Sequence, residues 1–62
     1  MATIRYFDGN KAVEITGTQT ELFKKGEELH ASGVSHTWLE FEDGRTMHSW
    51  TTETGGVDFR FE

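Results

Sequence analysis

Two histidines and two tryptophans lie at matching positions on either side of an Asp-Gly pair. They are His36 and Trp38 before Asp43-Gly44, and His48 and Trp50 after it, in the segment HTWLEFEDGRTMHSW. Imidazole nitrogens can bind metal ions or transfer protons near neutral pH, and indole rings can anchor a partner molecule. Which of these chemistries is available depends on which of the four side chains share one face of the hairpin.

The favoured interpretation of this hairpin is a two-residue turn. Asp43-Gly44 between two strand-like segments is typical of a type I′ turn. Leu39 then lies opposite His48, and both share an apolar face with Trp50. We therefore expect Trp50 in the core and Trp38 on the opposite, solvated face, where it is the candidate for function.

A second register is compatible with the same residues. A type I turn with a glycine bulge over Glu42-Asp43-Gly44 would shift the pairing by one position. Leu39 would then share a face with Met47 and Phe41. The other face would gather the side chains of His36, Trp38, His48 and Trp50.

Turn signals and hydrophobic periodicity divide the rest of the chain into short elements. Alternating segments are typical of strands, and the capping box of Thr18 and Glu21 marks the start of a helix. Gly26 lies on the apolar stripe of this helix, which indicates either a close approach to a bulky neighbour or a weak position that the helix tolerates. The predicted strands are residues 2–7, 11–16, 34–42, 45–53 and 57–62, and the helix lies between Thr18 and Gly33.

The first hairpin has one well-defined register. Gly9-Asn10 suits a type II′ turn, which places Tyr6 opposite Val13 and Arg5 opposite Glu14. Apolar pairs and an opposite charge pair then form together, as stable cross-strand pairing requires. The face away from the helix carries Thr3, Arg5, Phe7, Ala12, Glu14 and Thr16.

The last strand follows Gly55-Gly56 and alternates between apolar and charged residues. Val57, Phe59 and Phe61 are expected to face inward. If the two glycines form a two-residue turn, Trp50 lies opposite Phe61. The prediction is an α+β fold, with a five-stranded antiparallel sheet in ββαβββ order and one helix packed on one face.

Composition limits the classes of function. The 62 residues predict one small domain over residues 1–62, and the formal net charge of −5 disfavours a nucleic-acid or anionic-membrane binder. The chain has no cysteine, no signal-peptide pattern and no apolar run near the roughly 20 residues that span a bilayer. A cytoplasmic location is therefore the expectation.

Catalytic and metal chemistry are not expected. The favoured register puts His36 and His48 on opposite faces, and their spacing matches no metal signature. Carboxylates beside a turn are usually solvated, and so small a domain has little room for a ligand pocket of about 300 Å³. We expect no enzyme activity, no cofactor and no metal.

Protein binding through the open sheet face is the leading functional hypothesis. An exposed Trp38 beside Met47, with a polar rim, has the anatomy of an interface. The partner would be another protein, with a basic surface, or a second copy of the chain. Two alternatives are an acidic mimic of nucleic acid, through Glu40, Glu42 and Asp43, and, with less support, a surface for single-stranded nucleic acid. The residues predicted to bind the partner are Phe7, His36, Trp38, Glu40, Glu42, Arg45 and Met47.

Overall fold

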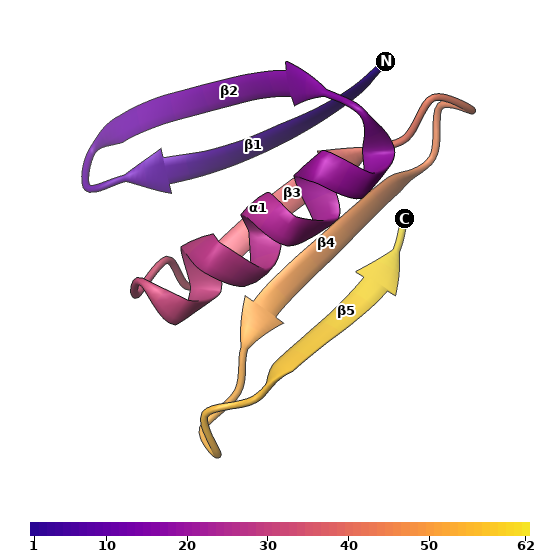
Figure 1. Ribbon diagram of the computed structural model, residues 1–62. Coiled ribbons are helices and arrows are strands. Elements are labelled where there is room, and N and C mark those ends of the chain that lie inside the picture. Colours follow the sequence, from indigo (N-terminus) through magenta and orange to yellow (C-terminus); the bar gives the residue numbers. More distant parts are fainter.

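A computed structural model describes residues 1–62 as five strands and one helix (Figure 1). All neighbouring strands are antiparallel, and their spatial order is β2-β1-β3-β4-β5. The predicted α+β class and the ββαβββ order are confirmed. In chain order the elements are β1 (Ala2–Asp8), β2 (Lys11–Gly17), α1 (Gln19–Ala31), β3 (His36–Glu40), β4 (Thr46–Thr51) and β5 (Val57–Phe61).

The helix covers only part of one sheet face. Helix α1 packs mainly on β1, β2 and β3, whereas β5 lies clear of it at one edge of the sheet (Figure 1). The opposite sheet face has no covering element. No helix of the chain is both long and apolar enough to cross a membrane.

The core lies between the helix and the β1–β3–β4 part of the sheet. Gly26 of α1 faces Ile4, and a Cβ added at Gly26 would lie 3.7 Å from Ile4 Cδ1. That is an ordinary van der Waals distance, so the contact between α1 and β1 at this point does not require a glycine. The buried apolar residues are Ala2, Ile4, Leu22, Leu29, Leu39, Phe41 and Met47.

Both predicted helix ends are present. The Thr18 hydroxyl accepts a hydrogen bond from the backbone N–H of Glu21 at 3.2 Å, which satisfies one free donor of the first turn. At the other end, the N–H groups of Gly33 and Val34 donate to the carbonyls of His30 (3.2 Å) and Leu29 (3.0 Å). This pair of bonds is a Schellman motif.

The first hairpin has the predicted register, with Tyr6 opposite Val13 and Arg5 opposite Glu14. Its turn is type II′, because φ is +63° at Gly9 and Asn10 keeps a negative φ.

The favoured register of the second hairpin is wrong, and the bulged alternative is correct. Leu39 lies opposite Met47, not opposite His48. The N–H of Phe41 donates to the Arg45 carbonyl (2.7 Å), and Gly44 takes the left-handed conformation with a φ of +90°. A type I′ turn would have placed both Asp43 and Gly44 at positive φ, whereas here only Gly44 has one. Asp43 instead accepts the Arg45 N–H at 3.0 Å.

The third hairpin repeats the same turn. The Thr52 N–H donates to the Gly56 carbonyl at 2.9 Å, and Gly55 has a φ of +85°. Gly55-Gly56 is therefore not a two-residue turn, and Trp50 lies opposite Asp58, not opposite Phe61. In the observed registers Trp50 lies on the open face, not in the core as expected, and it is half-buried there.

A buried polar network ties the end of the helix to the sheet. His30 Nδ1 lies 2.8 Å from the Val34 carbonyl, and Nε2 lies 2.8 Å from the Ser49 hydroxyl. A carbonyl only accepts, so Nδ1 carries the hydrogen and, in the neutral ring, Nε2 accepts from Ser49. The Thr37 hydroxyl then donates to Ser49. No pattern in the sequence indicated these partners for His30.

Candidate functional site

The open sheet face carries a row of rings that we call the aromatic face: Phe7, His36, Trp38, His48 and Trp50. They come from three adjacent strands, β1, β3 and β4. Alternate side chains of a strand point to the same face, and the bulged turn brings Trp38 opposite His48 and His36 opposite Trp50. His48 and Trp50 therefore join Phe7, His36 and Trp38 on this face only in the bulged register, which was the alternative interpretation of the sequence.

The rings contact one another in sequence across the sheet. Trp38 and His48 are stacked, with centroids 4.8 Å apart and planes 2° from parallel. Phe7 meets Trp38 edge-on from the other side of β3, at 6.4 Å. Trp50 lies 5.2 Å from His48. Since the rings lie against each other, Trp38 is not displayed as a flat platform for stacking with a base.

The two histidines of the aromatic face are hydrogen-bonded to each other. His36 Nδ1 and His48 Nε2 are 3.0 Å apart, so one nitrogen donates and the other accepts. The expectation that the two histidines lie on opposite faces is wrong. No group of three or more His, Cys, Asp or Glu side chains is placed to hold a metal ion. Two nitrogens alone fall short of the three or four protein ligands of a zinc site.

A hollow of about 270 Å³ adjoins this row of rings. Its lining includes Phe7 of β1, the small Ala12 that lies opposite Phe7 on β2, and Trp38 of β3. An ion pair borders it, with Arg5 Nε 2.7 Å from Glu14 Oε2. The hollow thus has an apolar lining and a charged rim.

The predicted binding residues do not all lie on one surface of the structure. Phe7, His36, Trp38 and Glu40 lie on the open face. Met47 lies on the other side of the sheet, in the core, with 9% of its surface exposed. The remaining two predicted residues, Glu42 and Arg45, lie outside the strands, at the β3–β4 turn.

Sequence reasoning in the favoured register missed His48 and Trp50, and it did not single out Ala12. A signal for Ala12 was present in the first hairpin, where a small residue faces Phe7 in the register that proved correct.

Each acidic residue of the predicted acidic mimic has a cation nearby. Glu40 Oε2 lies 3.9 Å from Arg5 Nη1, and Glu42 Oε1 lies 3.9 Å from the Met1 ammonium. Asp43 Oδ2 lies 2.9 Å from Arg45 Nε. The backbone N–H of Arg45, together with its guanidinium, lowers the pKa of Asp43. These contacts partly neutralise the acidic surface.

No protein-family model, curated protein or solved structure matches this chain. The chemistry of the aromatic face must therefore be judged from its own residues. It presents a half-buried indole, an apolar hollow and charged groups at the rim, which together suit non-covalent binding.

Proposed function

We propose that the chain is a non-catalytic interaction module that binds another protein through its aromatic face. The observation that carries this proposal is the hollow that Phe7, Ala12 and Trp38 help to line on this face. Tryptophan and arginine are enriched at interaction hot spots, and an apolar anchor site enclosed by polar groups is typical of interfaces. Here Trp38 forms part of the apolar anchor site, and Arg5 is one of the polar groups around it.

The chemistry of the hollow suggests what the partner presents. Its size and apolar lining suit one aliphatic or aromatic side chain from the partner. Glu14 and Glu40 lie near Arg5, and the whole chain has a net charge of −5. A partner with basic residues around its anchoring side chain would therefore be complementary.

The acidic mimic of nucleic acid has less support. Such a mimic needs free carboxylates in a spaced array, whereas Glu40, Glu42 and Asp43 each have a cation within 4.0 Å. Binding of single-stranded nucleic acid also has little support, because base stacking needs exposed ring faces with free cations beside them. Arg5 is engaged by two glutamates.

Filling the hollow tests the proposal without removing any existing contact. Ala12→Phe would place a ring in the hollow, and Trp38→Ala would delete one wall of it. Thr16→Phe is the matched control, because Thr16 is exposed on the same strand and face but does not line the hollow.

The three variants and the natural chain would be immobilised and exposed to extract of the source cells, and captured proteins would be quantified. We expect a partner that is retained by the natural chain and by Thr16→Phe, and lost by the other two. Equal retention by all four proteins would contradict the proposal.

A further inference from the structure

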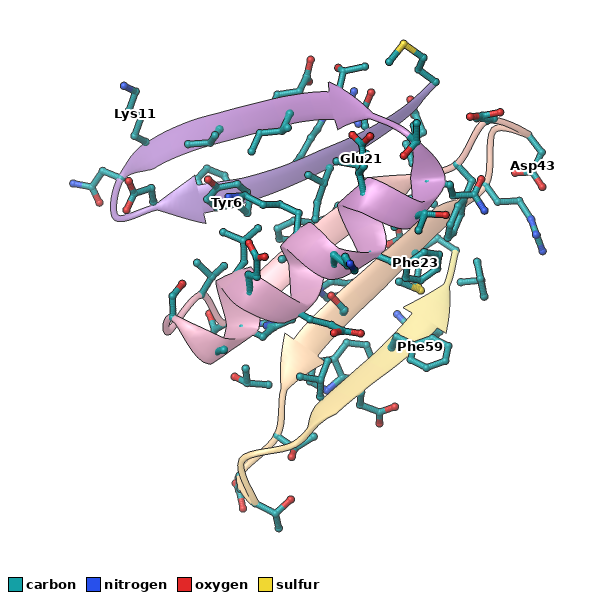
Figure 2. The ribbon with its side chains drawn as sticks, in the orientation of Figure 1. Tyr6, Lys11, Glu21, Phe23, Asp43 and Phe59 are labelled. Carbon is teal, nitrogen blue, oxygen red and sulfur yellow. The ribbon has the colours of Figure 1, made fainter.

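Strand β5 leaves an apolar edge uncovered. Val57, Phe59 and Phe61 point to the helix side of the sheet, as the sequence predicted, but they are 52%, 58% and 45% exposed. The reason is that α1 covers the other end of the sheet; Figure 2 shows Phe59 at the free edge and Phe23 on the helix nearby. An open groove of about 340 Å³, which Phe23 and these three β5 residues help to line, separates α1 from β5. Exposed apolar edge strands are ready to pair with another chain.

The backbone groups at this edge belong to the same three residues. In an antiparallel pair, alternate residues direct both their N–H and their C=O to the neighbouring strand. Gly56 and Glu62 form hydrogen bonds toward β4, with Thr52 and Thr46. By alternation Val57, Phe59 and Phe61 direct theirs away from the sheet. Consistent with this, the Phe59 N–H is bound only locally, by Asp58 Oδ1 at 2.8 Å.

The sequence of β5 is complementary to itself. In V-D-F-R-F, a two-fold axis through Phe59 pairs Asp58 with Arg60 of a second copy, and Val57 with Phe61 of that copy. Phe59 meets its own counterpart. Opposite charges and large apolar side chains that face each other directly stabilise antiparallel pairs. The outward N–H and C=O groups of the same residues would form reciprocal hydrogen bonds.

We propose that the chain forms a two-fold symmetric dimer in which β5 pairs with β5 of a second copy. The two sheets join into one ten-stranded antiparallel sheet. Both helices lie on one side, and both aromatic faces lie on the other side and stay free. On pairing, the Phe59 N–H exchanges Asp58 for the Phe59 carbonyl of the second copy, which releases Asp58 to meet Arg60. The dimer forms at the β5 edge, whereas the hollow proposed for the protein partner lies over β1, β2 and β3.

The other free edge is less suited to a symmetric dimer. The same centred arrangement of β2 would place Glu14 directly opposite Glu14 of the second copy. Like charges that face each other across strands are destabilising. Glu14 is also bound to Arg5 within the chain.

A charge-reversal experiment tests the pairing. Asp58→Arg would place two arginines opposite each other, and Arg60→Asp would place two aspartates opposite each other. Sedimentation of the natural chain between roughly 1 μM and 1 mM is expected to show a monomer–dimer equilibrium. Each single variant is expected to weaken dimerisation about tenfold or more at low salt. An equimolar mixture of the two variants restores complementary pairs and should form a heterodimer as strong as the natural dimer.

A second pair of variants distinguishes the surfaces. Phe59→Lys changes an exposed side chain at the proposed axis and is expected to abolish the dimer while the circular dichroism spectrum is unchanged. Thr16→Lys places the same residue on the β2 edge and is expected to leave the dimer intact. A natural chain that stays monomeric at 1 mM, or a mixture that does not recover dimerisation, would overturn the proposal. So would a dimer that only Thr16→Lys or Trp38→Ala disrupts, because it would use the other edge or the aromatic face.

Discussion

Trp38 and His48 lie directly opposite each other on β3 and β4, with their ring planes 2° from parallel. This relationship requires the bulged turn at Gly44, because a two-residue turn would place His48 opposite Leu39. It decides which large side chains belong to the core and which to the open face. Nuclear Overhauser contacts between the Trp38 and His48 rings would verify it, whereas contacts between Leu39 and His48 would contradict it.

The two tryptophans are expected to contribute similarly and moderately to stability. Both are half-buried on the open face, so Trp38→Ala and Trp50→Ala lose ring contacts without leaving a closed cavity. We expect about 1–2 kcal/mol of destabilisation for each. Leu39→Ala, at a position with 2% exposure, is expected to cost about 2–5 kcal/mol. Urea denaturation measures all three, and complete unfolding by Trp50→Ala alone would place Trp50 in the core after all.

Removal of the Ser49 hydroxyl is expected to lower the free energy of unfolding, although the hydroxyl is a small group. Ser49→Ala leaves His30 Nε2 without its partner at 2.8 Å, and an unsatisfied buried acceptor costs about 1–3 kcal/mol. Ser35→Ala is a suitable control, because Ser35 is exposed. An equal free energy of unfolding for the two variants would show that the network does not form.

A methyl group at position 26 is expected to stabilise the protein. Gly26→Ala removes a glycine from mid-helix, which is worth up to about 1 kcal/mol, and the new Cβ would lie at an acceptable 3.7 Å from Ile4 Cδ1. Gly44→Ala is expected to destabilise, because the φ of +90° there strains any residue with a Cβ. Thermal unfolding of both variants tests the opposite signs. A lower melting temperature for Gly26→Ala would mean that the helix lies closer to β1.

Asp43 should contribute to stability in a pH-dependent way. The Arg45 N–H and guanidinium lower its folded-state pKa below the ordinary 3.8. The contribution is therefore fully present above the unfolded-state pKa, and it is lost as the pH falls through the folded-state value. Asp43→Asn keeps an oxygen that can accept the Arg45 N–H but removes the charge. Its stability should decline less than that of the natural chain between about pH 5 and pH 2; parallel declines would show that Asp43 does not contribute.

The sequence predicted the first hairpin correctly, because its register depends on neighbouring residues alone. A two-residue turn at Gly9-Asn10 agrees with both the apolar pairs and the charge pair of the flanking strands, so the sequence predicted the pairing of Tyr6 with Val13. Asp43-Gly44 is compatible with two turns. The choice between them depends on the conformation of Asp43 and on whether Met47 or His48 enters the core, and propensity alone does not decide that. The candidate site was harder to predict, because the hollow requires β1 and β3 to lie side by side, a non-local pairing that places Arg5 opposite Trp38.

The sequence pattern also did not predict that the apolar side chains of β5 are exposed. Alternation correctly assigned Phe59 and Phe61 to the helix side of the sheet. It could not reveal that one 13-residue helix would pack at the β1–β3 end and leave these rings uncovered.

The most direct test of the aromatic face as the binding surface is an NMR titration of ¹⁵N-labelled protein with its captured partner. We predict that the largest shifts occur at the backbone amides of Phe7 and Ala12 and at the Trp38 indole N–H, and that Ala12→Phe abolishes them. Shifts confined to α1 and β5, with the Trp38 indole signal unchanged at saturation, would contradict the proposed function.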